Sequence, residues 1–425
     1  MKLVLPIILS AYFATALTVE RLHGHRDITQ NEANQWEIFK SKFNKNYSTQ
    51  TEHDNRLKIF INHLRKFDAH NSDASKTYKM GVNQFTDLTW DEFRNEILMT
   101  HPKKMRTSKT SEADSDDQLP WPEESWEFAC PKKFEGATIP ENFSKRCDWR
   151  NPNYNPKNLV ADVGVKNQAS CGSCYVFSAV AAMEGSLCLN GHYDCSNGNW
   201  SGLSEQMALN CASYDETVSD RTWERSYGCS GGWQTNVLQY VYKTGGIISE
   251  DQMPYLSGDR SYFDNKYNIG TCPYTWETQA DFLNKHSQGR LSKDICGTTN
   301  KGGIADANLM KQALFSKGPL AISMYVGDNF RHVHSGIYIP DETDSSDCPH
   351  EDLLAYGTNH AMAAVAYRTA KLIDEEGNEK ELEYWVIKNS WDTTFAEEGY
   401  VNVIRGRNAC GIEGNISYVE MEKSE

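Results

Sequence analysis

Two cysteines and a glutamine mark the segment that is best suited to chemistry. The residues from Gln168 to Cys174 lead into a largely apolar stretch that ends near Leu189 and predicts a buried helix. Cys174 would therefore stand at a helix N-terminus, where positive partial charge favours the nucleophilic thiolate. Gln168 and the backbone N–H of Cys174 are then placed to stabilise a developing oxyanion.

The same segment has two competing interpretations. Cys171-Gly172-Ser173-Cys174 has the spacing of a redox pair, but such a pair expects a nearby βαβ pattern, which the sequence lacks. A purely structural disulfide suits Cys171 and leaves Cys174 unexplained. We therefore favour Cys174 as a catalytic nucleophile.

A thiolate nucleophile needs a base, and the base needs a group that orients it. His360 opens a β-type run, and Asn389 ends another. We expect the two side chains to meet by a hydrogen bond that fixes the imidazole tautomer, with Trp391 shielding that bond from water. His332 and His334 have no further ligands beside them in the sequence, so we predict no metal site there.

The surrounding pattern changes from helical to β-type along the chain. An apolar helix over 173–189 and further helices over 203–210 and 234–244 precede β-type runs over 320–325, 361–367 and 383–387. This order predicts an α+β fold with a cleft between two halves. Before it, apolar spacing predicts two helices within 31–71, a strand over 77–80 and a short helix from about 88 that Thr89 caps.

Composition and length exclude several classes of function. The chain has 425 residues with 43 Lys+Arg against 58 Asp+Glu, so its net charge of -15 argues against a nucleic-acid-binding surface. No apolar run long enough to span a membrane follows the N-terminus. Lys2 and the apolar stretch to Ala16 are typical of a secretory signal peptide. The 12 cysteines then belong in an oxidising compartment.

Residues 101–126 are rich in charge and poor in apolar side chains. This composition predicts an exposed, protease-sensitive linker, with a charged surface loop of one domain as the alternative.

From about Ile139 to the C-terminus, the chain resembles the papain family of cysteine proteases, in its cathepsin L-like branch. The matching segments, in chain order, are Ile139-Pro140-Glu141, Asp148-Trp149-Arg150, Val165-Lys166-Asn167-Gln168, the Cys174 segment, Leu203-Ser204-Glu205-Gln206, Gly228-Cys229-Ser230-Gly231-Gly232, Gly318-Pro319, Ser335-Gly336-Ile337-Tyr338, Asn359-His360-Ala361, Lys388-Asn389-Ser390-Trp391, Glu398-Gly399-Tyr400 and Cys410-Gly411-Ile412. The resemblance implies a two-domain fold, with a helical left domain bearing Cys174 and a β-barrel-like right domain bearing His360 and Asn389.

The N-terminal part resembles the helical propeptide of the same family. Glu52, Arg56, Phe60 and Asn71 match the spacing of its long helix, residues 81–87 match its second motif, and His63 and Phe67 stand where Asn and Ile are usual. The resemblance implies an inhibitory propeptide that lies through the cleft in the non-productive direction and loosens when acid protonates its carboxylates. The implied organisation is a signal peptide over 1–18, a propeptide over 19–100, a linker with the activation cleavage over 101–138 and a peptidase domain over 139–425.

By position, the resemblance also implies three disulfides, Cys171–Cys229, Cys211–Cys272 and Cys348–Cys410. Cys188 and Cys195 are close enough in sequence to bridge locally, and a Cys130–Cys147 bridge would tether the linker to the enzyme after cleavage. Cys296 has no assigned partner.

Several residues depart from the family pattern. Tyr175 and Asp392 stand where Trp and Gly are usual, and Phe395-Ala396 replaces Trp-Gly. The stretches 190–200, 212–227 and 257–303 are longer than in compact members.

The predicted function is that of a secreted, lysosomal or vacuolar cysteine endopeptidase, made as a zymogen and needing neither metal nor organic cofactor. Its implied partners are peptide or protein substrates, its own propeptide and cystatin-like inhibitors. An aminopeptidase or dipeptidyl peptidase, a transpeptidase and an inactive binding relative remain as alternatives. Because Asn415 is uncharged, we expect aliphatic or aromatic side chains in the pocket for the second residue before the cut. The substrate-binding residues implied by alignment are Gly231, Gly232, Trp233, Ser323, Asn359, Trp391 and Asn415.

Overall fold

The computed structural model describes residues 28–99, 138–212, 226–256, 272–274, 278–291, 296–297, 306–341, 343–344, 346–348, 357–373 and 379–423. The expected signal peptide over 1–18 and nearly all of the expected linker over 101–138 lie outside these residues. Within the described ranges, no helix is both long enough and apolar enough to cross a membrane.

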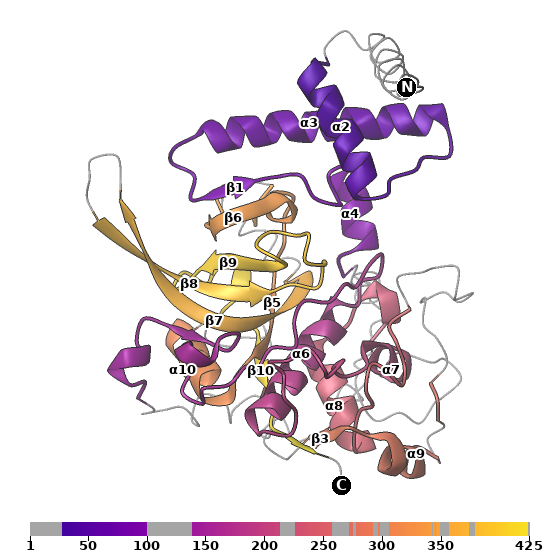
Figure 1. Cartoon of the computed structure of the whole chain (residues 1–425), viewed down its shortest axis with the longest axis vertical. Coiled ribbons are helices and arrows are strands. Elements are labelled where there is room, and N and C mark those ends of the chain that lie inside the picture. The colour runs from indigo at the N-terminus through magenta and orange to yellow at the C-terminus, as the bar shows by residue number, and fades with distance from the viewer. Residues whose placement is uncertain are drawn as a thin grey trace, which may run out of the picture.

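Two crossing helices form the N-terminal part, at the top of Figure 1. They are α2 (Gln30–Lys42) and α3 (Gln50–Ser72), followed by β1 (Tyr78–Met80) and α4 (Trp90–Glu96). Thr29, Thr49 and Thr89 each accept a backbone N–H at a helix start, which satisfies donors that would otherwise lack a partner. The predicted helices, strand and Thr89 cap are therefore confirmed.

A second helical layer surrounds α6 (Cys174–Leu189), which is buried along nearly its whole length. Its neighbours are α7 (Glu205–Cys211), α8 (Gln234–Thr244) and α9 (Gln279–His286). The sequence predicted all of these except α9. A helix that is apolar all round must be buried on every side, and α6 packs between α8 and the strands β5 and β7.

The β half is one mixed sheet with the strand order β1-β6-β9-β8-β7-β5-β10-β4, and β2 pairs with β7 outside this path. A separate pair joins β11 to β3. β7 and β8 are longer than predicted, and α10, β6 and β9 were not predicted. The bounds are β2 (Cys147–Asp148), β3 (Gly289–Leu291), β4 (Cys296–Gly297), α10 (Ala307–Lys317), β5 (Leu320–Met324), β6 (Val333–Tyr338), β7 (His360–Ile373), β8 (Glu379–Lys388), β9 (Tyr400–Ile404), β10 (Ile416–Tyr418) and β11 (Met421–Lys423). Short 3₁₀ helices are η3 (Glu141–Phe143), η4 (Pro152–Tyr154), η5 (Gly228–Ser230), η7 (Phe330–His332) and η8 (Ala409–Gly411).

The N-terminal part joins this sheet directly, because β1 pairs antiparallel with β6. Tyr78 lies opposite Gly336, where φ is +91°, and a Cβ at that position would approach the carbonyl oxygen of Thr77 to 2.5 Å. Glycine therefore allows the close approach of the two backbones.

Four disulfides occur among the described residues: Cys171–Cys229, Cys188–Cys195, Cys211–Cys272 and Cys348–Cys410. They agree with the three pairings implied by the resemblance and with the local bridge. The expected Cys130–Cys147 bridge is wrong, because Cys147 is a buried free thiol on β2. Burial raises the pKa of this thiol to about 12.

Candidate active site

Cys174 is the first residue of α6, and its side chain is 0% exposed. The backbone N–H of Ala361 donates to Cys174 Sγ over 3.4 Å. Because Ala361 follows His360 on β7, this contact joins the helical half to the β half beside the thiol. The cysteine and the histidine that the sequence singled out thus come from opposite sides of the domain boundary.

His360 is the first residue of β7 and is also 0% exposed. Its Nε2–H donates to Asn389 Oδ1 over 2.8 Å, and its ring stacks on Trp391 with centroids 4.6 Å apart. Among the described residues, Nδ1 has no hydrogen-bond partner. The Asn389 contact holds the proton on Nε2, so the lone pair of Nδ1 is available as a base.

Burial sets the protonation state of both groups. It raises the pKa of the Cys174 thiol to about 12, against hydrogen bonds from backbone N–H groups that favour the thiolate. It lowers the pKa of His360 to about 4, while the Asn389 hydrogen bond acts in the opposite direction. In this closed form both groups are therefore neutral, rather than a thiolate and an imidazolium.

The residues Ile97, Leu98 and Met99, which follow α4, cover the site. The side-chain amide of Gln168 donates to the carbonyl oxygen of Ile97 over 2.8 Å. The backbone N–H of Met99 donates to the carbonyl oxygen of Asn359 over 3.0 Å. All three covering residues are buried, which accounts for the lack of exposure of the thiol and the imidazole.

Gln168 is held in place on its other side. Ser390 Oγ donates to Gln168 Oε1 over 2.6 Å, and Gln168 Nε2 also donates to the carbonyl oxygen of Cys171 over 2.8 Å. The Gln168 amide, which we expected to stabilise an oxyanion, is therefore already oriented by Ser390. In this closed form it donates to the carbonyl oxygen of Ile97.

The expected substrate-pocket residues are only partly brought together. Thr358 Oγ1 donates to Ser323 Oγ over 3.0 Å, and Asn415 Nδ2 lies 3.5 Å from Thr358 Oγ1. A Cβ on Gly231 would approach Met99 Cβ to 2.9 Å, so Met99 lies directly against Gly231.

Three other expected pocket residues, Asn359, Trp233 and Gly232, have separate contacts. Asn359 offers its carbonyl oxygen to Met99, while its side chain bonds both backbone groups of Val326. Trp233 precedes α8 and is partly exposed. Gly232 packs against the Tyr175 ring, where a Cβ would approach Tyr175 Cε2 to 2.7 Å.

Tyr255 was not among the residues predicted from the sequence. Its hydroxyl donates to the carbonyl oxygen of Gln168 over 3.0 Å and lies 2.7 Å from Ser173 Oγ. Tyr255 thus connects the residue before Cys174 with the backbone of Gln168. Only the folded chain brings it there, because it lies 87 residues from Gln168 in sequence.

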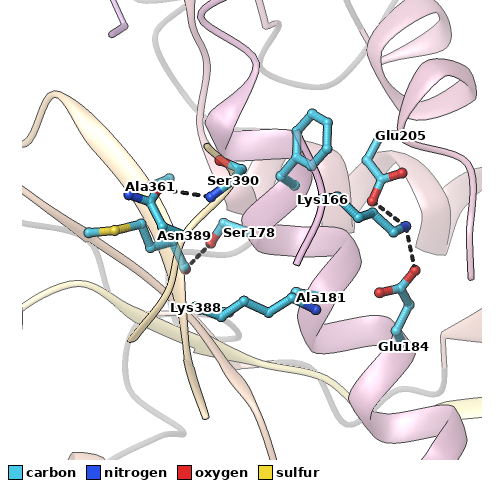
Figure 2. Close-up of a pocket in the computed structure, with 12 residues that line it drawn as sticks. Lys166, Ser178, Ala181, Glu184, Glu205, Ala361, Lys388, Asn389 and Ser390 are labelled. Atoms are coloured by element: carbon cyan, nitrogen blue, oxygen red, sulfur yellow. Dashed lines mark hydrogen bonds and ion pairs between the residues drawn. The ribbon is translucent and has the colours of Figure 1, made fainter. Parts of the chain in front are cut away.

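A small cavity lies behind the site, between α6 and the end of β8 (Figure 2). Space for the centre of a water-sized sphere amounts to about 20 Å³, enough for a water molecule and too little for a substrate side chain. On its wall, Lys166 Nζ contacts Glu184 Oε1 at 2.7 Å and Glu205 Oε1 at 2.6 Å. Burial raises the pKa of Glu205 to about 8. This cluster fixes the segment that leads to Gln168 onto α6 and α7.

Among the described residues, one cluster outside the site has the side-chain types that bind metals. The side-chain nitrogen and oxygen atoms of His63, Asp328 and His332 lie within 4.8 Å of one another. Asp328 already pairs with Lys66 at 2.8 Å and with Arg331 at 2.6 Å. Two cations around a single carboxylate make the cluster poorly suited to a metal ion.

Two family models match most of the described chain. The family model described as papain family cysteine protease matches residues 143–420, and the cathepsin propeptide inhibitor domain (I29) matches residues 36–93. Cysteine proteinase 15A of Pisum sativum is 30% identical over 94% of this chain and 90% of that protein. Pro-cathepsin H of Bos taurus is 28% identical over 88% of this chain and 86% of that protein.

The solved structure of digestive procathepsin L2 from Tenebrio molitor larval midgut superposes with a TM-score of 0.64. It is 26% identical and covers 91% of this chain and 99% of its own. The chain therefore belongs to the papain family of cysteine proteases and is a zymogen, with a cathepsin propeptide inhibitor domain ahead of its peptidase domain.

Proposed function

We propose that this zymogen matures to an endopeptidase in which Cys174 is the nucleophile and His360 the general base and acid. One observation carries the proposal: a peptide carbonyl, that of Ile97, is hydrogen-bonded to Gln168 beside the buried Cys174 thiol. The His360–Asn389 hydrogen bond supports it, because it leaves Nδ1 as the basic nitrogen. With the propeptide removed, water re-enters the cleft and we expect the thiolate–imidazolium pair to form.

The reaction follows from these roles. The Cys174 thiolate forms a bond to the substrate carbonyl carbon, and the oxyanion is held by the Gln168 amide and the Cys174 N–H. His360 gives its proton to the leaving nitrogen as the C–N bond breaks. It then takes a proton from the water that attacks the thioester, so the C–S bond breaks, the acid is released and the thiolate–imidazolium pair is restored. Loss of one oxyanion donor typically costs about 10²–10³ in rate.

The propeptide indicates which substrates fit. In a productive substrate, the scissile carbonyl would lie at Gln168 and the second residue before the cut would lie at Gly231. From its N-terminus to its C-terminus, such a substrate would therefore run from Gly231 toward Gln168. The propeptide runs from Ile97 at Gln168 to Met99 at Gly231, which is the opposite direction. The side chain it places against Gly231 is apolar, in keeping with a preference for aliphatic or aromatic residues at that subsite.

Endopeptidase action is the favoured specificity because the segment Ile97 to Met99 contacts Gln168 beside Cys174 and continues to Gly231. An aminopeptidase, a dipeptidyl peptidase and a transpeptidase share the same chemistry and differ in substrate terminus or acceptor. Digests of one long peptide with free and blocked termini would separate them. Internal cuts in both peptides are expected, whereas cuts confined to the free terminus would contradict the proposal.

By the same proposal, the chain follows the secretory pathway to a lysosome, vacuole or the medium. The stretch over 1–18 and the disulfides support this route, since disulfides persist in oxidising compartments.

The central test follows the uncleaved chain after transfer to acidic pH in the presence of an epoxide that traps thiolates. We expect the first hundred-odd residues to be removed and the label to map to Cys174. Cys174→Ala should neither mature nor be labelled, whereas Cys147→Ala, which removes the other free thiol found among the described residues, should still be labelled. A chain that is matured by an added protease yet stays unlabelled at Cys174 would point to an inactive binding relative.

A further inference from the structure

Arg331 of η7 contacts the loop between β1 and α4 from the peptidase domain. Its side chain is 1% exposed. It donates to the carbonyl oxygens of Leu88, over 3.0 Å, and Phe85, over 3.3 Å. Its guanidinium also lies 5.2 Å from the centre of the Phe93 ring of α4. One buried cation of the enzyme thus holds three parts of the propeptide.

The same guanidinium contacts a histidine of the propeptide helix α3. Arg331 Nη2 lies 3.3 Å from His63 Nε2, and His63 Nδ1 lies 2.7 Å from the carbonyl oxygen of Thr86. A guanidinium can only donate and a carbonyl oxygen can only accept, so Nε2 must accept and Nδ1 must carry the proton. The contact therefore requires a neutral His63.

The groups around His63 disfavour its charged form, in which both ring nitrogens carry a proton. The charged groups that face it are Lys66 of its own helix, with Asp328 and Arg331 of the peptidase domain. Asp328 Oδ1 accepts from Arg331 and Oδ2 from Lys66, so the single carboxylate is already shared by two cations.

His332 packs against the other side of this histidine. The two ring centroids lie 4.5 Å apart, and His332 is 0% exposed. Neither ring nitrogen of His332 has a hydrogen-bond partner in the described part of the chain. A proton on either ring would thus add charge beside Arg331, and Asp328, the carboxylate within 4.8 Å of both rings, is already shared by Arg331 and Lys66.

We propose that His63 is the acid-sensitive latch of the zymogen: its protonation breaks the Arg331 contact and starts the release of the propeptide from the peptidase domain. The latch concerns opening of the closed chain and holds whether or not Cys174 is the catalytic group. It is a feature of this chain, because the resembling propeptides usually have Asn at this position, and Asn does not titrate.

The direction of the pH effect follows from linkage. Burial, with Arg331 as a further cause, lowers the pKa of His63 in the closed chain, while the Thr86 hydrogen bond opposes the shift. A group whose pKa is lower in the closed state stabilises that state above its free pKa, about 6.5 for histidine, and this contribution is lost as the pH falls.

Carboxylates respond in a different range. The pKa of Glu92 is lowered by the Arg56 contact and by hydrogen bonds from Thr89, against burial, so this pair weakens only below the usual range of a carboxyl group. His63 would therefore act first on acidification, and the carboxylate pairs would follow.

The test uses the full chain with Cys174→Ala, which cannot cleave itself. Hydrogen exchange of the backbone amides over 78–88, corrected for the intrinsic effect of pH, reports opening of the β1–β6 contact. Between about pH 7 and 5.5, the opening constant should rise about tenfold more with His63 present than in His63→Asn. His63→Gln serves as a second non-titrating variant in case the asparagine variant folds poorly.

His53→Asn is the matched control on the same helix, since the hydrogen bonds of His53 go to Trp36, Gln50 and Asp54 of the propeptide itself. It should keep the pH response of the unchanged chain. If His63→Asn and His63→Gln open with the same pH dependence as the unchanged chain, the latch proposal is overturned and carboxylates set the release. Because no cleavage is measured, a failure here is distinct from a failure of the proposed catalytic roles.

Discussion

At the scale of single residues, exclusion of water controls the proposed catalytic pair. Cys174 and His360 are both fully buried, and burial moves their pKa values in opposite directions, to about 12 and about 4. Each shift favours the neutral form, so the proton stays on sulfur. The helix N-terminus at Cys174 favours the thiolate but does not outweigh desolvation while Ile97 to Met99 cover the site.

The first prediction concerns this proton. At neutral pH the uncleaved chain should show no thiolate absorbance from Cys174, because its pKa lies far above that pH. After removal of the propeptide the absorbance should appear. The measurement is the ultraviolet difference spectrum between the unchanged chain and Cys174→Ala, before and after maturation. A thiolate signal of full size in the closed chain would contradict the neutral pair.

Tyr255 carries the second prediction. In the mature enzyme, Tyr255→Phe removes one hydrogen bond to the Gln168 carbonyl and one to Ser173, so kcat should fall about three- to tenfold with KM little changed. Tyr193→Phe makes the same chemical change at a hydroxyl that bonds Gln288, and should leave kcat unchanged. A rise in KM alone would show that Tyr255 supports substrate binding rather than the position of Gln168.

At the scale of elements, the loop after β8 holds three non-glycine residues in the left-handed region of backbone conformation. Asp392, Ala396 and Glu398 all have positive φ, of 69°, 46° and 55°. A non-glycine residue in this conformation costs about 1–2 kcal/mol. Phe395 lies between them and packs edge-on against Trp391, with ring centroids 4.8 Å apart. Aromatic packing thus holds the loop beside Asn389 in a backbone conformation that would otherwise favour glycine.

The third prediction tests this strain at Glu398, whose side chain is exposed. Glu398→Gly should raise the free energy of unfolding by about 0.5–1 kcal/mol, because relief of strain exceeds the entropic cost of glycine. Thermal unfolding of the Cys174→Ala chain measures the change. Thr393→Gly, at a nearby exposed residue without positive φ, should lower stability. Equal effects of the two changes would show that the loop stores no strain at Glu398.

At the scale of the whole molecule, the propeptide is bound at both ends of one path. β1 lies beside β6 and extends the enzyme's sheet, and α4 follows it along the chain (Figure 1). Ile97 and Met99, just after α4, contact Gln168 and Gly231. Backbone pairing at one end and contacts with Gln168 and Gly231 at the other, where we propose that substrate binds, together close the site. Opening either contact should weaken the other, because a single short segment connects them.

The fourth prediction concerns the cleft end of this path. Met99 is 4% exposed, so Met99→Asp buries a carboxyl group that lacks a partner, which costs about 1–3 kcal/mol. At neutral pH, the intact variant should be labelled at Cys174 by an epoxide about tenfold faster or more. Met99→Leu keeps the apolar volume and should label at the rate of the unchanged chain. Unchanged labelling of Met99→Asp would show that this side chain does not help to close the site.

The local sequence was enough to predict elements whose formation depends on neighbouring residues alone. Thr89 caps α4 because its hydroxyl reaches a backbone N–H three residues away, and α6 is identifiable because it is apolar on every side. The short helices α9 and α10, and short strands such as β6 and β9, were not found. Their formation depends on partners that lie far away in sequence.

The residue types and spacing alone determined the family, the zymogen organisation and the candidates Gln168, Cys174, His360 and Asn389, since these follow from motifs. Only the tertiary structure decided the protonation state of Cys174, the free thiol of Cys147, the contact of Tyr255 and the place of His63 against Arg331. Each of these depends on desolvation or on a contact between distant segments. Burial and long-range contacts exist only in the folded chain, so no local pattern of residues records them.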